Sequence, residues 1–170
     1  MVTALSKDEA WPALPLAEWS ATYATLHMWT QIVGKIRLAF SAPVNHWWQV
    51  PLYVSARGLT TTAIPFPLGN FEIEFDFIEH VLRTVTSRGE TKTIKLAPRS
   101  VADFYAEFLS TLASLGINAK IWPMPVEIPN PIRFDRDTVH ASYDPVYANR
   151  CWRILSSVDR VLNDLHEGLE

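Results

Sequence analysis

Apolar residues recur at steps of three and four in three parts of the chain, which is the pattern of a helix that buries one face. The first helix is expected between Pro15, which suits a first helical position, and Gly34, which suits the residue just past a helix end. Its mostly apolar face comprises Leu16, Trp19, Tyr23, Leu26, Thr30 and Val33. Ser100 and Asp103 resemble a capping box and predict a second helix, which Gly116 would end.

A long C-terminal helix is the third. Asp144 suits its N-cap and Pro145 its first position. Apolar residues at helical spacing are expected to form its inner face, and they are Tyr147, Cys151, Ile154, Leu155, Val158, Leu162 and Leu165.

After the first helix the apolar period changes from 3.6 to two, as in half-buried β-strands. The pattern predicts six consecutive strands and a short seventh at 119–122. The six cover residues 35–40, 46–54, 59–64, 71–78, 81–86 and 91–96. Short loops between consecutive strands require antiparallel neighbours, so the sheet is expected to be a meander.

The strand at 71–78 has the clearest alternation. Four apolar residues face one way, namely Phe71, Ile73, Phe75 and Phe77, and the carboxylates of Glu72, Glu74 and Asp76 face the other. A turn at residues 79–80 would place Asp76 opposite Arg83 as a charge pair. A glycosidase or a metal-dependent enzyme could use such a carboxylate row. Alternation alone also explains it, so we interpret the row as the solvent face of an antiparallel sheet.

These elements predict one α+β domain over residues 1–170, with 1–14 as an irregular N-terminal segment. An N-terminal, a middle and a long C-terminal helix would pack on a curved antiparallel sheet of six to seven strands. The net charge of −3 argues against nucleic acid as a partner, and no apolar run approaches the length of a membrane span. The lone Cys151 and the absence of a signal-peptide pattern favour a cytoplasmic location.

Aromatic residues and an unusual connector indicate where a site would lie. Trp47 and Trp48 are adjacent on a predicted strand, so they point to opposite faces. Trp122 opens a proline-rich connector that ends at Asp144. Long connectors inside a domain are often functional, and we expect this one to fold back over the sheet, cover a cleft and bring His140 near the paired indoles.

The expected ligand site consists of residues from the second strand and the connector: His46, Trp48, Trp122, His140 and Tyr143. His140 is the acid–base candidate because imidazole changes charge near neutral pH. The histidines lack the close spacing of zinc motifs, and Cys151 lies on a predicted inner helix face, so neither a metal nor a cofactor is predicted.

Six strings carry a resemblance to a known family. They are 26–35 (LHMWTQIVGK), 45–48 (NHWW), 52–61 (LYVSARGLTT), 98–105 (PRSVADFY), 122–125 (WPMP) and 140–145 (HASYDP). In these strings the chain resembles an uncharacterised bacterial family, domain of unknown function 5996, from about Trp11 to the last helix. The resemblance implies no activity and no catalytic residues. It also implies that the chain corresponds to the N-terminal part of the family, as a short member or a fragment.

Two functions are compatible with these patterns. The first is the binding of a small apolar or aromatic molecule in a cleft between helices and sheet, with or without a reaction. The second is an interaction or assembly module whose exposed aromatic residues contact another protein, a second copy of the chain or the other part of a longer protein.

Overall fold

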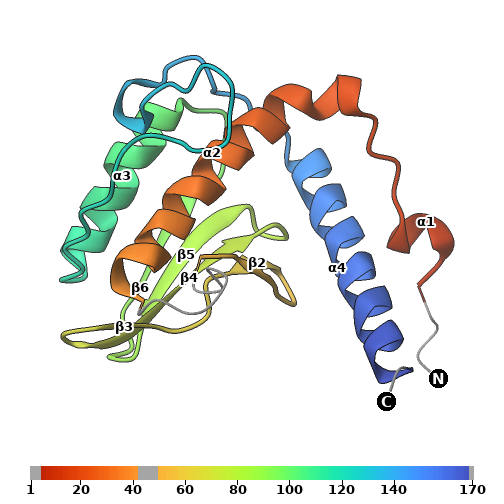
Figure 1. Cartoon of the computed structure of the whole chain (residues 1–170), viewed down its shortest axis with the longest axis horizontal. Coiled ribbons are helices and arrows are strands. Elements are labelled where there is room, and N and C mark those ends of the chain that lie inside the picture. The colour runs from red at the N-terminus through yellow and green to blue at the C-terminus, as the bar shows by residue number, and fades with distance from the viewer. Residues whose placement is uncertain (1–4, 42–49, 169–170) are drawn as a thin grey trace.

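Four α-helices and a six-stranded antiparallel sheet make up the part of the computed structural model that is described, residues 5–41 and 50–168 (Figure 1). This arrangement confirms the predicted α+β class. In chain order the elements are α1 (Lys7–Ala10), α2 (Leu16–Phe40), β1 (Tyr53–Val54), β2 (Gly58–Thr60), β3 (Ile64–Phe66), β4 (Gly69–Asp76), β5 (Val81–Thr86), β6 (Thr91–Lys95), α3 (Val101–Ser114), the 3-10 helix η2 (Phe134–Arg136) and α4 (Pro145–Glu167).

The sheet is open, with the order β1-β2-β4-β5-β6. β2 pairs with the second half of β4 and β3 with its first half, so both lie on the same side of β4. The predicted strand 59–64 is therefore broken in the middle, where Thr62 has a φ of 58° and cannot continue a strand. Of the predicted strand 46–54 only β1 is seen, and residues 42–49 lie outside the described part. Residues 119–122 form no strand.

The predicted end of the first helix is wrong. α2 continues through Phe40, so the expected strand at 35–40 does not exist. Ile32, Val33 and Ile36 are all buried, which extends the helical apolar face beyond Gly34. Gly34 lies inside the helix instead, and a Cβ there would meet the carbonyl oxygen of Val50 at 3.4 Å, an ordinary contact distance.

The alternation in β4 is confirmed. Phe71, Ile73, Phe75 and Phe77 are at most 1% exposed, and they form the core together with the inner faces of α2 and α3. The register with β5 differs from the prediction by two residues: Glu74 lies opposite Arg83 and Asp76 opposite Val81. The connecting turn is therefore longer than two residues. A shift of two keeps every side chain on its predicted face.

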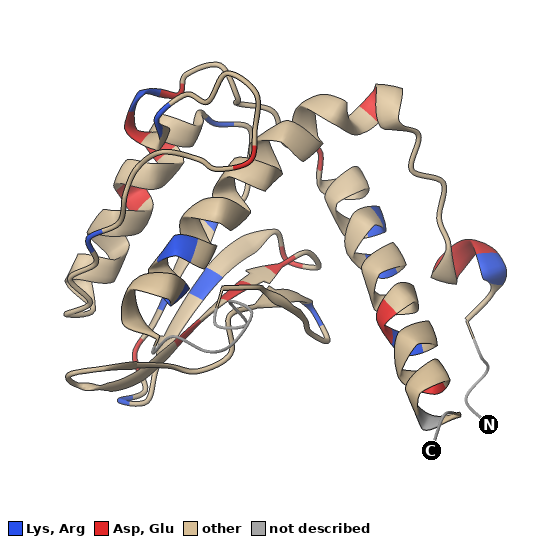
Figure 2. Cartoon of the chain, viewed as in Figure 1, with Lys and Arg blue, Asp and Glu red and all other residues tan. Residues whose placement is uncertain are grey.

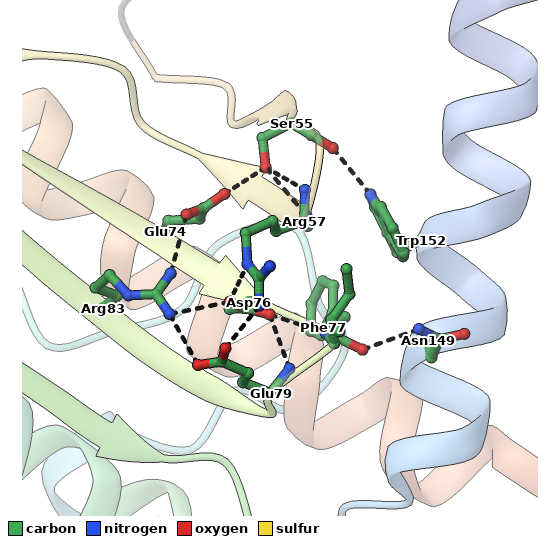
Figure 3. A network of polar contacts seen from close by, with 11 residues as sticks. Ser55, Arg57, Glu74, Asp76, Phe77, Glu79, Arg83, Asn149 and Trp152 are labelled. Atoms are coloured by element: carbon green, nitrogen blue, oxygen red, sulfur yellow. Dashed lines mark hydrogen bonds and ion pairs between the residues drawn. The ribbon is translucent and has the colours of Figure 1, made fainter.

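The carboxylate of Asp76 is completely buried at the end of β4, in the network drawn in Figure 3. It accepts hydrogen bonds from Arg57, from Arg83 at 3.1 Å, and from two backbone N–H groups of the following turn at 2.9 Å. These interactions hold the pKa of Asp76 at about 2, against the desolvation that would raise it. This carboxylate of the predicted row is thus a structural anchor for the β4–β5 turn and the β1–β2 turn.

α3 begins and ends as predicted, with Ser100 capping its N-terminus by accepting a hydrogen bond from the N–H of Asp103. α4 begins as predicted at Asp144. Its expected inner face is, however, largely exposed from Leu155 on: Leu155 is 38% exposed, and Leu162 and Leu165 are each 59% exposed.

The first half of α4 is the part that holds it to the sheet. Asn149 donates to the carbonyl of Phe77, and the indole of Trp152 donates to the carbonyl of Ser55. Beyond these contacts α4 runs beside α1, on the side of the molecule away from α3 (Figure 1). In the second half α1 covers Ser157, which donates to the carbonyl of Ala10, but Leu162 and Leu165 stay exposed.

Candidate functional site

One cleft, with a volume of about 550 Å³, lies between α2, the edge of the sheet and α4. α2 contributes its His27–Leu38 face, β1 and β2 contribute Val54 and Leu59, and α4 contributes Leu155. Val50, Pro51 and Leu52 line it between α2 and β1. Among the described residues that line it, no Asp or Glu occurs. The cleft is thus a mostly apolar hollow with a few polar groups on one helix.

Gln31 closes the cleft on the side of the connector. Its amide nitrogen donates to the carbonyl of Val126, and its amide oxygen accepts from the N–H of Val126, both at 2.9 Å. The same amide nitrogen lies 3.2 Å from Nε2 of His27. Because that nitrogen is a donor, Nε2 of His27 accepts, and a neutral His27 carries its proton on Nδ1. Gln31 therefore holds the connector on α2, and His27 is the partner of its amide nitrogen within the helix.

Lys35 is one helical turn further along the same face. Its ammonium group lies 5.1 Å from the centroid of the Trp122 ring, a cation–π contact. Burial lowers the pKa of Lys35 because part of the hydration shell of the ammonium group is lost. Along α2 the only acidic residue, Glu18, is in the first turn, and the basic residues are near the other end (Figure 2). The cleft therefore has a positive wall.

A smaller hollow of about 140 Å³ lies on the other side of the connector crossing. It is lined by residues 128–132 of the connector, by His140, and by four residues of α2: Tyr23, Ala24, His27 and Met28. His27 lines both hollows. The connector thus crosses α2 and borders two hollows along the helix. The prediction that it folds back over the sheet is wrong.

His140 forms an imidazole–carboxylate pair with Asp137. Nδ1 of His140 is 2.7 Å from Oδ2 of Asp137, whose side chain is completely buried. The other oxygen of Asp137 accepts from the N–H groups of Val139 and His140, both at 3.0 Å. With Nδ1 directed at the carboxylate, Nε2 is the ring nitrogen that can meet a molecule in the small hollow. The pair has the chemistry of an oriented general base.

Tyr143, near the end of the connector, is buried in the core and does not line the small hollow with His140. Its ring stacks on Trp29 with centroids 5.6 Å apart, and its hydroxyl lies 2.8 Å from Nδ1 of His80. Burial raises the pKa of Tyr143 and lowers the pKa of His80, since both charged forms are desolvated there. Nε1 of Trp29 is the single buried side-chain donor or acceptor without a partner among the described residues. This cluster joins α2, the β4–β5 turn and the connector as core packing.

The structure places the three described residues of the predicted site in different surroundings. His46 and Trp48 lie outside the described residues. Trp122 is 64% exposed and meets the large cleft through Lys35, His140 lines the small hollow, and Tyr143 is in the core.

Sequence reasoning missed Lys35, Gln31 and the role of His27. Their spacing of four residues would have placed them on one face if the helix had been extended beyond Gly34.

The remaining chemistry of the described part is structural. Glu72 accepts from the hydroxyl of Thr60 at 2.6 Å, and Glu74 accepts from the hydroxyl of Ser55 at 2.6 Å. Each carboxylate of the predicted row therefore has a partner of its own. Over residues 5–41 and 50–168, no three His, Cys, Asp or Glu side chains form a group that could hold a metal ion. Burial raises the pKa of the Cys151 thiol, which keeps it in the unreactive form.

Fold and hollows together define the class: an α+β protein with an apolar, partly basic cleft between a long helix and the edge of an open sheet. The chain belongs to a family of unknown function (DUF5996), whose model matches residues 11–168. No curated protein and no solved structure matches the chain. None of the described helices is both long and apolar enough to cross a bilayer.

Proposed function

We propose that the protein binds a small, largely apolar or aromatic molecule in the cleft between α2, the sheet edge and α4. The observation that carries the proposal is the cleft itself: about 550 Å³ of space with mostly apolar walls and a few polar groups on α2. Ligand sites in proteins have this size and this composition. The lone Cys151 supports placing this role in the cytoplasm, where thiols stay reduced.

An uncharged fluorescent probe, N-phenylnaphthylamine, tests this role directly. The probe should bind in a saturable, one-to-one manner, because its two aromatic rings match an apolar cleft of this size. Leu155→Gln, which puts an amide into the wall, should weaken binding about fivefold, since roughly 1 kcal/mol of apolar contact is lost. The measurement is a fluorescence titration of the folded protein.

Leu162→Gln is the matched control. Leu162 lies seven residues further along α4, on the same face, but does not line the cleft. It should leave the affinity for the probe within about twofold of the unmodified chain, a difference below 0.5 kcal/mol. Equal weakening by both substitutions, or no saturable binding at all, would argue against the cleft as a ligand site.

A catalytic role for His140 stays a prediction within this proposal. Asp137 orients the ring, so Nε2 would be the atom that exchanges a proton with a molecule in the small hollow. Lys35 lines the larger cleft and contacts Trp122, and Tyr143 packs on Trp29 in the core. Binding at the cleft and proton transfer at His140 can therefore be measured separately.

A second candidate function is self-association through α4, favoured by an exposed apolar stripe. Leu155, Val158, Leu162 and Leu165 follow each other at steps of three and four, which is the spacing of a two-helix seam. We propose the α4 of a second copy as the partner, because a twofold axis buries the same stripe on both chains.

Light scattering coupled to size-exclusion chromatography tests this second candidate. The mass should rise toward that of a dimer with increasing concentration, and the double substitution Leu162→Gln with Leu165→Gln should keep the chain monomeric because it interrupts the seam. A monomer at every concentration would remove this candidate and leave the cleft proposal untouched.

A further inference from the structure

The cation on the wall of the cleft is the feature that the proposed function does not use. Lys35 is a half-buried ammonium group, and no ion pair joins it to a carboxylate of the described residues. The other charged residue nearby on α2, Arg37, is committed: it donates to the carbonyl of Pro51 and lies over the ring of Tyr53 at 4.9 Å. Lys35 is therefore the one charge that the described wall of the cleft leaves without a counter-ion.

The polar neighbours of Lys35 in the cleft are already occupied. Gln31 is bonded to Val126 and His27, and the hydroxyl of Thr30 donates to the carbonyl of His27 at 2.9 Å. Both groups are uncharged, so neither supplies a counter-charge for the ammonium group. The partner that Lys35 does have is the face of Trp122, which attracts a cation through its ring quadrupole but carries no negative charge.

An unpaired ammonium group in an apolar hollow is costly, because it loses hydration without gaining an opposite charge. An anion bound beside the ammonium group would offset this loss of hydration through a charge-assisted hydrogen bond. The apolar remainder of the cleft would hold the rest of the molecule. The contact with Trp122 favours the position of the ammonium group seen here, which is where the anion would bind.

We propose that the cleft selects ligands that combine an apolar or aromatic body with a single anionic head, such as a carboxylate, and that Lys35 binds that head. This inference rests on the proposed function. The body would lie against Leu38, Leu59 and Leu155, and the head would lie at the Lys35–Trp122 pair.

Two probes with the same ring system separate the charge from the apolar body. Anilinonaphthalenesulfonate carries a sulfonate, which is anionic at every usable pH, and N-phenylnaphthylamine carries none. Lys35→Met should weaken binding of the sulfonate about tenfold, as expected for the loss of a charge-assisted contact, and should leave the neutral probe within about twofold. Lys35→Arg should restore most of the affinity for the sulfonate.

The control substitution is Lys92→Met, on the exposed side of β6 and outside the cleft. It should change neither affinity, which excludes an effect of net charge alone. Salt should weaken the binding of the sulfonate to the unmodified chain and to Lys92→Met, but not to Lys35→Met.

The possible results distinguish this inference from the function on which it rests. If the neutral probe binds and Lys35→Met leaves the ratio of the two affinities unchanged, the anion inference is wrong and the apolar cleft stands. If neither probe binds the unmodified chain, the proposed function fails first. Because the neutral probe also reports an intact cleft, a misfolded Lys35→Met variant would be recognised by the loss of both.

Discussion

Replacing Asp76 with alanine is expected to lower the free energy of unfolding by about 3 kcal/mol, because it leaves Arg57 and Arg83 without the buried carboxylate between them. Two backbone N–H groups of the β4–β5 turn would lose their acceptor as well. This expected loss of stability is at the lower end of the range for breaking a buried ion pair, because Arg83 keeps Glu74 and Glu79 as partners. Denaturant unfolding, followed by circular dichroism, measures the change.

The control for this substitution is Glu79→Gln, in the same network (Figure 3) but with a side chain that is 61% exposed. It should cost less than about 1 kcal/mol, as exposed ion pairs do. A similar loss for both substitutions would show that the burial of Asp76 does not matter.

Acid titration gives an independent measure of the same carboxylate. The pKa of Asp76 is about 2 in the folded chain and 3.8 when unperturbed, so its contribution is present above pH 3.8 and is lost as the pH falls toward 2. The unmodified chain should lose about 2 kcal/mol through this group over that interval, and Asp76→Ala should lack that part of the acid dependence. Parallel curves for the two chains would contradict the assignment.

Local patterns predicted the parts of the fold that local patterns determine. Strict alternation in β4 places four apolar side chains in the core, and the caps at Ser100 and Asp144 begin their helices as expected. The C-terminal end of α2 could not be predicted in the same way. Residues 35–40 alternate like a strand, but the burial of Ile36 beside Ile32 and Val33 requires the helical geometry.

The candidate site depends on contacts that no local pattern contains. Gln31 and Val126 are 95 residues apart in sequence, and the match between amide and backbone appears only once the connector crosses α2. The pair of Asp137 and His140 spans only three residues, and spacing alone could have suggested it. In the second half of α4 a local pattern was misleading. Its apolar stripe predicted burial, but the described residues supply no surface that covers the stripe.

Gly58→Ala is expected to lower the free energy of unfolding by about 3 kcal/mol and to abolish probe binding in the cleft. A Cβ at Gly58 would lie 1.7 Å from the carbonyl oxygen of Phe75, which belongs to the backbone of the neighbouring strand β4. A backbone oxygen cannot move aside as a flexible side chain can, so β2 would have to separate from β4. Leu59 lines the cleft and would move with β2, which links the loss of stability to the loss of binding.

The opposite result is expected for the second glycine that borders this region. Gly34→Ala should raise the free energy of unfolding by up to about 1 kcal/mol, because alanine favours a helix interior and its Cβ meets Val50 at an ordinary contact distance of 3.4 Å. Thermal unfolding and titration with the neutral probe measure both glycine substitutions side by side. Gly58→Ala could be as stable as Gly34→Ala and still bind the probe only if β2 can move away from β4 at little cost. That result would contradict the close β2–β4 packing that forms this wall of the cleft.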